Sequence, residues 1–155
     1  MPDEKPFFAV SDNPPGMYDE SGASIVNVDD YPKYEIADGL VFCPVFAGNV
    51  SLNFVTFPAG SGFPSHVHPE EQISIIQEGE MEFTIGEATR MVRPGDVIIL
   101  PPHVPHSGRT FDGACRVLDI YSPPRHGTKD LIANASPLNP GETDDRWPSG
   151  GPEPA

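Results

Sequence analysis

The chain has 155 residues, including 20 prolines and 15 glycines, and 37% of the residues are hydrophobic. This length fits one domain with a substantial core, and the many prolines and glycines argue against long helices and for short strands joined by tight turns. The net charge of −14 disfavours nucleic acid and membrane surfaces as partners, because an acidic surface repels phosphate backbones and anionic lipids.

The N-terminal segment shows no targeting signal. It lacks a basic region, and the apolar stretch 7–10 is too short for the core of a signal peptide. No apolar run reaches membrane-spanning length, so the sequence predicts a cytoplasmic protein. Cys43 and Cys115 each lie in an apolar, strand-like stretch. We expect two buried free thiols rather than a disulfide.

In chain order, residues 1–24 are rich in turn-forming residues and predict an irregular segment. A series of short strands follows, with alternating or continuously apolar patterns and intervening turns. The predicted strands are Asn49–Phe57, Gln72–Gln77, Met81–Ile85, Val97–Leu100 and Ala114–Tyr121. From about Ala135 the chain becomes polar again. Without a convincing helical period, this pattern predicts an all-β sandwich or barrel.

Three histidines and one glutamine form a candidate site for a divalent metal. His66 and His68 stand two residues apart, a spacing that places both side chains on one face of a strand. Gln72 follows at the start of the next predicted strand, and His106 comes much later. Neutral imidazoles with an amide oxygen suit zinc, iron, nickel or copper, and they leave room for water or substrate on the metal.

The spacing of these residues resembles the two-part signature of the cupin family. The first part is Gly60-(five residues)-His66-x-His68-(three)-Gln72-(six)-Gly79, and the second is Gly95-(five)-Pro101-x-His103-(two)-His106. The resemblance implies a cupin double-stranded β-helix, or jelly-roll, barrel with irregular N- and C-terminal extensions. It places an N-terminal extension at residues 1–34, the barrel at 35–127, and a polar, Pro/Gly-rich tail at 128–155.

The resemblance also implies the assembly and the ligands. Similar cupins form homodimers in which an N-terminal strand crosses to the neighbouring barrel, a role open here to Ile25–Val28 or Leu40–Phe46. The implied metal ligands are His66, His68, Gln72 and His106.

This chain departs from the usual cupin pattern at three positions. Gln72 stands where most cupins have glutamate, and the adjacent Glu71 should point to the opposite face of its strand. His103 replaces a glycine and is expected on an exposed turn, not as a ligand, and Thr110 replaces an asparagine. The neutral glutamine is more typical of members that use the metal as a Lewis acid. We therefore favour zinc, with nickel, iron or manganese as alternatives.

A second resemblance follows the barrel motifs. The stretch from Asp119 to Arg125 is similar to a segment of the cupins that open the rings of unsaturated uronates, and small cupins of this kind also include polyketide cyclases. Carried over, Asp119 is the proton shuttle, Arg125 binds a carboxylate, and Tyr121 replaces the usual aromatic residue and adds a hydroxyl. A buried Asp119 needs a partner such as Arg125 or a raised pKa, and both fit acid–base work. The residues alone also leave open a purely structural Asp119–Arg125 ion pair.

These features predict a non-oxidative enzyme for a small molecule. A Lewis-acid metal and Asp119 would isomerise, open or cyclise a substrate that contains a carbonyl or enol, of the unsaturated-uronate or polyketide type. The alternatives are a quercetinase-like dioxygenase with iron or another redox metal, and a metabolite-binding cupin without turnover. The acidic stretch Glu70, Glu71, Glu78, Glu80 and Glu82 is expected mostly on a solvated face.

Overall fold

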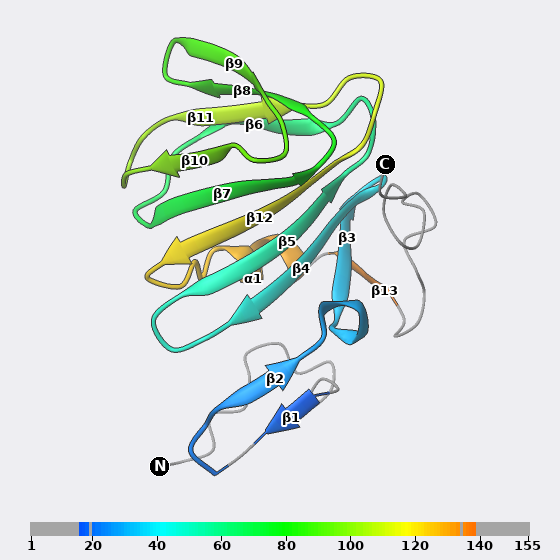
Figure 1. Ribbon diagram of the computed structural model, residues 1–155, viewed down its shortest axis with the longest axis vertical. Helices are drawn as coiled ribbons and strands as arrows, with labels where there is room; N and C mark the ends of the chain where they lie inside the picture. The colour runs from blue at the N-terminus through cyan, green and yellow to red at the C-terminus, as the bar shows by residue number, and fades with distance from the viewer. Residues whose placement is uncertain (1–15, 19, 134, 139–155) are drawn as a thin grey trace.

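The structure is a computed structural model that describes residues 16–18, 20–133 and 135–138. Its strands form a seven-stranded sheet, a four-stranded sheet and a small two-stranded hairpin (Figure 1). The ends of the predicted extensions, residues 1–15 and 139–155, lie outside the described residues. No helix in the described part of the chain is long and apolar enough to span a membrane.

The larger sheet has the strand order β10-β7-β12-β5-β4-β3-β13. Its strands are β3 (Lys33–Ala37), β4 (Leu40–Phe46), β5 (Ser51–Phe57), β7 (Glu71–Glu78), β10 (Val97–Leu100), β12 (Cys115–Ser122) and β13 (Ser136–Leu138). The smaller sheet has the order β6-β11-β8-β9. Its strands are β6 (Gly62–His66), β8 (Met81–Ile85), β9 (Ala88–Val92) and β11 (His106–Arg109). All strand pairs are antiparallel, which short loops allow.

The extensions contain more regular structure than the sequence predicts. In the N-terminal extension, β1 (Gly16–Tyr18) pairs with β2 (Ser24–Val26), and a single 3-10 turn spans Val28–Asp30. Figure 1 shows this hairpin projecting below the barrel. At the other end, α1 (Thr128–Ala133) follows β12, and β13 pairs with β3. The all-β class holds, since α1 is the one α-helix of the described residues.

The core lies between the two sheets. Its cluster draws on both of them and contains Leu40, Val55, Phe57, Ile76, Met81, Phe83, Val92, Ile98, Leu100, Cys115 and Val117. In β5 the odd-numbered residues are buried and the even-numbered ones half-exposed, as a strand with one face towards a core requires. Cys43 and Cys115 are both buried free thiols, as predicted.

The three motif glycines, Gly60, Gly79 and Gly95, all have positive φ, between 65° and 98°. Gly79 joins β7 to β8 with φ 73°, and a Cβ there would collide with the carbonyl of Ala114. Only glycine fits position 79 without strain, because a side chain there would be disfavoured both by the left-handed backbone conformation and by the closely packed backbone of Ala114. The spacing of the motif glycines thus reflects turns that join consecutive strands.

Replacing Gly79 by alanine is therefore expected to lower the free energy of unfolding by more than about 2 kcal/mol. Urea denaturation followed by circular dichroism measures this change. The matched control is Gly113→Ala, because Gly113 has no positive φ and open space around its Cβ position, and its effect should stay within about 0.5 kcal/mol. Equal stability of the two variants would contradict the role given to Gly79.

Candidate metal centre and acid–base group

His66, His68 and His106 converge inside the barrel. One ligand atom from each lies within 4.8 Å of the others, and the His66 and His106 ring centroids are 4.4 Å apart. His66 is the last residue of β6, and His106 is the first of β11, its antiparallel partner. His68 lies beyond the end of β6, so strand alternation does not explain its position, and that part of the sequence argument was wrong. The predicted triad of histidines is nevertheless brought together.

Each of these histidines has its Nδ1 within hydrogen-bond distance of a backbone carbonyl. His66 faces the oxygen of Pro64 at 3.0 Å, His68 that of Glu70 at 3.1 Å, and His106 that of Val104 at 2.9 Å. A carbonyl can only accept, so all three imidazoles donate from Nδ1 and keep the Nε2 lone pair for another partner. This is the arrangement by which proteins fix the tautomer of metal-binding histidines.

Burial disfavours the charged forms of His68 and His106. Burial is the main cause that lowers the pKa of His106 to about 4. Burial is also the main cause that lowers the pKa of His68, and there the positive charge of Arg125 is the next cause. His106 is 2% exposed, and its Nε2 has no hydrogen-bond partner among the described residues. An unpaired buried nitrogen is costly, and a cation ligated by the three rings would satisfy it.

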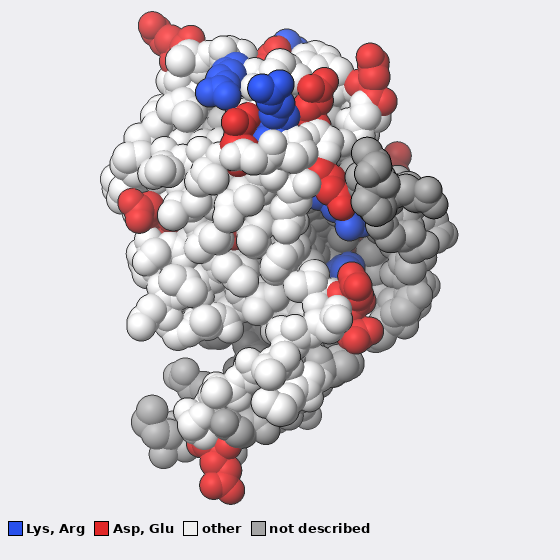
Figure 2. All heavy atoms as spheres, in the orientation of Figure 1, with Lys and Arg blue, Asp and Glu red and all other residues white. Residues whose placement is uncertain are grey.

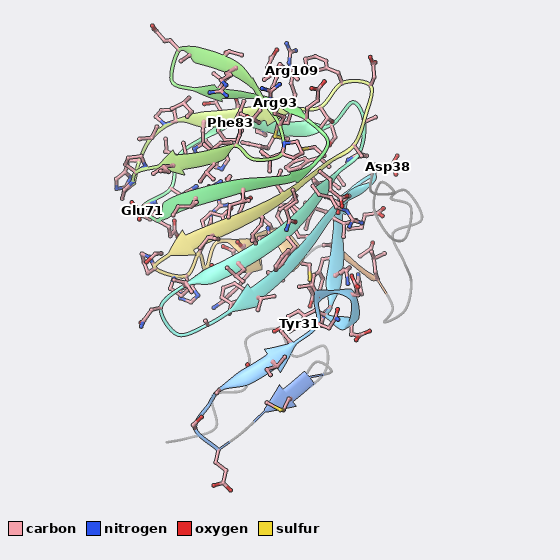
Figure 3. All side chains as sticks on the ribbon, in the orientation of Figure 1. Tyr31, Asp38, Glu71, Phe83, Arg93 and Arg109 are labelled. Carbon is pink, nitrogen blue, oxygen red and sulfur yellow. The ribbon has the colours of Figure 1, made fainter. Side chains whose placement is uncertain are left out.

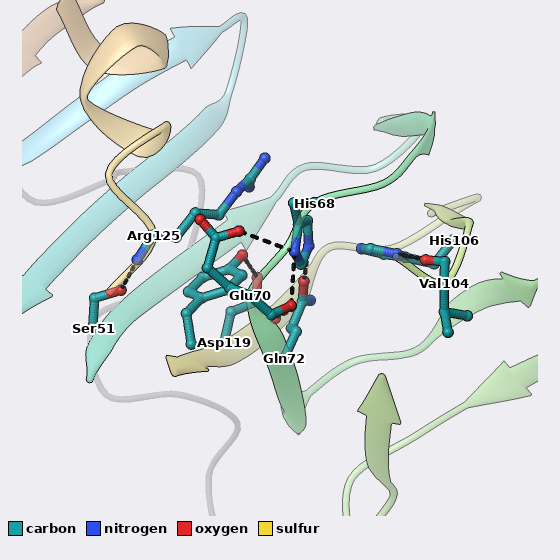
Figure 4. A network of polar contacts seen from close by, with 9 residues as sticks. Ser51, His68, Glu70, Gln72, Val104, His106, Asp119 and Arg125 are labelled. Carbon is teal, nitrogen blue, oxygen red and sulfur yellow. Dashed lines mark hydrogen bonds and ion pairs between the residues drawn. The ribbon is translucent and has the colours of Figure 1, made fainter. Parts of the chain in front are cut away.

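Gln72 lies beside the histidines with its amide oxygen towards them. On β7, Gln72 is buried and Glu71 is exposed, as the alternation predicts. The Gln72 Nε2 group donates to Ser74 Oγ at 2.9 Å and to Asp119 Oδ1 at 3.3 Å, which fixes the orientation of the amide. Its Oε1 then lies 2.9 Å from His68 Nε2 (Figure 4).

The contact between Gln72 and His68 brings two electron-rich atoms together. With the Nδ1 tautomer of His68, both Gln72 Oε1 and His68 Nε2 are acceptors, an arrangement that repels unless a positive charge lies beside both. The donor set of neutral imidazoles and one amide oxygen suits a divalent transition metal. His66, His68, His106 and Gln72 therefore fit a metal ion. The identity of the metal does not follow from these donors.

Asp119 borders this centre on the neighbouring strand β12. Val117, Asp119 and Tyr121 face the barrel interior, and Leu118 and Ile120 face outwards, as predicted. Ser74 donates to Asp119 Oδ1 at 2.5 Å, and Tyr121 donates to Oδ2 at 3.4 Å. Burial raises the pKa of Asp119 to about 6 against the opposing effect of these hydrogen bonds.

Arg125 lies near Asp119 without forming an ion pair with it among the described residues. Its guanidinium carbon is 5.5 Å from the centroid of the Tyr121 ring, and its backbone N–H donates to Ser51 Oγ at 2.9 Å. The purely structural Asp119–Arg125 ion pair that the sequence left open is thus not formed among the described residues. Burial and the adjacent Asp119 also raise the pKa of Tyr121, so its hydroxyl stays protonated.

Sequence reasoning missed three polar residues around the centre. Glu70 turns inwards, with its side chain 12% exposed and Oε2 3.5 Å from His68 Nδ1, whereas an alternating strand would leave it in solvent. Ser74 is fully buried beside Asp119, and Asn53, 3% exposed, lies directly across from Asp119 on β5. The signal for Ser74 and Asn53 was a polar residue at an inward-facing position of an alternating strand.

His103 and Thr110, the two other departures from the usual pattern, have structural roles. His103 is exposed, as predicted, with φ 64°, the left-handed conformation that favours the usual glycine, and it lies outside the cluster of His66, His68 and His106. Thr110 is buried, and its hydroxyl donates to Pro58 O at 2.5 Å and accepts from Ser61 N at 3.0 Å. It thereby fixes the loop that leads into β6 and His66.

The fold and the clustered histidines define a cupin-type barrel with a candidate metal centre. Residues 53–121 match the family model of the cupin domain, and the resemblance to cupins seen in the sequence is thereby confirmed.

Among related proteins, the dimethylsulfoniopropionate lyase DddQ of Ruegeria pomeroyi is 39% identical over 79 residues, which are 50% of this chain and 39% of that protein. The chain thus spans less than half the length of this relative.

Two solved structures show the same fold at lower identity. KdgF from Halomonas sp. matches with 22% identity and a TM-score of 0.59, over 62% of this chain and 91% of that one. The polyketide cyclase RemF from Streptomyces resistomycificus matches with 23% identity and a TM-score of 0.57, over 63% of this chain and 78% of that one. Catalytic cupins are therefore among the proteins that this chain is similar to.

Proposed function

We propose that this chain is a metal-dependent, non-oxidative cupin enzyme that moves a proton at a carbon next to a carbonyl, enol or carboxylate group of a small molecule. The observation that carries the proposal is the Asp119 carboxylate, which is joined through Gln72 to the three-histidine cluster. A carboxylate with a pKa near 6 in such a place is suited to acid–base catalysis, because proton transfer is most efficient when the pKa lies near the working pH.

His66, His68, Gln72 and His106 would hold the metal. A bound divalent cation supplies Lewis acidity to an oxygen of the substrate. Asp119 accepts or returns the proton at its carboxylate, which Ser74 and Tyr121 orient by their hydrogen bonds.

Arg125 supplies a positive charge beside Tyr121 that can hold a carboxylate of the substrate by two parallel hydrogen bonds. The substrate class that fits these groups best therefore bears a carboxylate.

Three reactions share this proton transfer. They are the ring opening of an unsaturated uronate, the cyclisation of a polyketide, and an elimination. In the elimination, Asp119 takes a proton from the carbon next to a carboxylate, and a leaving group departs with its bonding electrons from the next carbon. The elimination is supported by the similarity to the lyase of Ruegeria pomeroyi. Uronates and dimethylsulfoniopropionate both carry the carboxylate that Arg125 would bind.

The test is an assay of the full chain loaded in turn with zinc, nickel, manganese or iron(II). The substrates are an unsaturated uronate, dimethylsulfoniopropionate and a linear polyketide analogue, with an oxygen electrode recording uptake. We expect product from a carboxylate substrate without oxygen consumption. Oxygen uptake that matches product formation would instead indicate the dioxygenase. Calorimetric binding of these compounds without any product would indicate a metabolite-binding cupin.

A further inference from the structure

Glu70 is a buried carboxylate that the proposed reaction does not use. The chain contains 23 Asp and Glu residues, and Figure 2 shows several of them on the surface of the face drawn. The side chain of Glu70 is instead 12% exposed, and its Oε2 atom is buried without a hydrogen-bond partner among the described residues. An unpaired buried charge is costly, so the inward position of Glu70 requires an explanation.

The loop after β6 turns this carboxylate inwards. The chain bends at Pro69 and Glu70, and the N–H of His103 donates to the carbonyl of His68 at 2.9 Å. Strand β7 begins at the next residue, Glu71, which is exposed. Figure 3 shows the labelled Glu71 at the margin of the barrel, where β7 starts. Two consecutive carboxylates therefore have opposite surroundings, one beside the metal centre and one in solvent.

Glu70 lies behind His68, at the edge of the ring opposite the Nε2 atom. Its Oε2 is 3.5 Å from His68 Nδ1, and its backbone oxygen accepts from the same Nδ1–H at 3.1 Å. Among the described His, Cys, Asp and Glu residues, the ligand atoms that lie within 4.8 Å of one another belong to His66, His68 and His106. Glu70 is thus outside the ligand cluster, and Figure 4 shows it on one side of His68 with His106 on the other.

The charge of Glu70 matters because the ligands themselves have none. Gln72 occupies the position at which most cupins have glutamate, so imidazoles and an amide would leave the charge of a divalent cation uncompensated. Burial and then the positive charge of Arg125 lower the pKa of His68, so a cation at this ring meets repulsion. Asp119, the other carboxylate near the centre, already accepts hydrogen bonds from neighbouring side chains. Glu70 remains as the carboxylate free to offset this repulsion.

We propose that Glu70 is a positioning residue that supplies, through His68, the negative charge that the ligand position of Gln72 lacks. This inference rests on the metal centre of the proposed function. When His68 Nε2 binds a cation, the imidazole loses electron density and its Nδ1–H becomes a stronger donor towards the Glu70 carboxylate. In return, the carboxylate orients the ring and makes it a more basic ligand. The buried charge is therefore stabilised in the metal-bound protein and costly in the metal-free one.

The proposal is tested by the zinc affinity of the metal-free full chain at one neutral pH, measured by competition with a chromophoric chelator. Glu70→Gln should bind zinc about 10–100-fold more weakly, the usual effect of losing a residue that supports a ligand. The matched control is Glu71→Gln, which removes the same charge from the next residue, where it is exposed. Its affinity should stay within about threefold of the unmodified chain, because solvent screens an exposed charge. Equal affinities of the two variants would overturn the proposal.

A second background separates supply of charge from support of the loop. In a Gln72→Glu chain, the ligand position itself carries a carboxylate, so the further change Glu70→Gln should weaken zinc binding much less than it does in the unmodified chain. If Glu70 only supported the loop that carries His68, its loss would have the same effect in both backgrounds, because the two effects would add. Equal losses in the two backgrounds would therefore overturn the proposal.

Thermal unfolding gives a readout that does not depend on the affinity. Without metal, Glu70→Gln removes an unpaired buried charge, so it should unfold at an equal or higher temperature than the unmodified chain. Zinc should raise its unfolding temperature less, because weaker binding stabilises less. A metal-free variant that unfolds at a clearly lower temperature would show that Glu70 supports the fold and would overturn the proposal.

The outcomes also distinguish this inference from the proposed reaction. Zinc binding by the unmodified chain with no effect of Glu70→Gln would contradict the role of Glu70 alone. The predicted affinities without turnover of any substrate would contradict the reaction alone. An unmodified chain with no affinity for zinc would contradict both.

Discussion

The His106→Ala variant is expected to fold as a barrel and to lose nearly all of its bound divalent metal. The His106 Nε2 atom is buried, has no hydrogen-bond partner among the described residues, and lies in the cluster of histidine ligand atoms. Removing a ligand should cost more than the roughly 10–100-fold in affinity that follows the loss of a residue supporting a ligand. Elemental analysis of the purified full chain measures the metal, with about one equivalent expected in the unmodified protein.

The fold should survive this change, because His106 lies at the first position of β11 and its pairing with β6 and β8 uses the backbone. Its ring stacks at 6.2 Å on Phe83, so some packing is lost, and a modest fall in stability is expected.

The matched control is His103→Gly. His103 is exposed, lies three residues before His106, and already has the left-handed backbone that glycine prefers. The His103→Gly variant should keep its full metal content. Equal metal content in the two variants would show that His106 is not a ligand and that the site lies elsewhere.

The parts of the fold that could be predicted from sequence are those with strong alternation. In β7 and β12 the alternation correctly separated Glu71 from Gln72 and Leu118 from Asp119. In contrast, β9 has four exposed residues followed by a buried one, so it has no period that could identify it. The strands β1, β2 and β13 have three residues each and depend on their pairing partners, which a local pattern cannot reveal.

For the site, the sequence indicated the ligands by spacing but not the reason for their convergence. His68 lies in the loop after β6, and its placement depends on the backbone hydrogen bond from His103 N to His68 O, 2.9 Å long, across 35 residues of chain. The inward turn of Glu70 depends on the same loop. Such contacts depend on the tertiary fold, whereas the inward positions of Gln72 and Asp119 follow from strand alternation alone.

The Asp119→Asn variant is expected to keep its metal and lose turnover of the substrate that the unmodified chain converts, by about 10²–10⁴-fold, the usual contribution of a general acid or base. Asparagine keeps an oxygen that can accept the hydrogen bond from Ser74 but cannot take up a proton at neutral pH. The Glu82→Gln variant is the control, because Glu82 pairs with the exposed Arg109 on the smaller sheet. It should keep full activity.

A stability measurement separates catalysis by Asp119 from a structural role. Burial raises the pKa of this carboxyl in the folded protein to about 6 from 3.8, so folding favours the protonated form. The stability from this preference is present below about pH 4 and is lost as the pH rises through about 6. In the metal-free protein, Asp119→Asn should therefore unfold at an equal or higher temperature at pH 8, and the difference should shrink at pH 4. A variant that unfolds more easily at pH 8 would show that the carboxylate stabilises the barrel, and its loss of activity could then not be assigned to proton transfer.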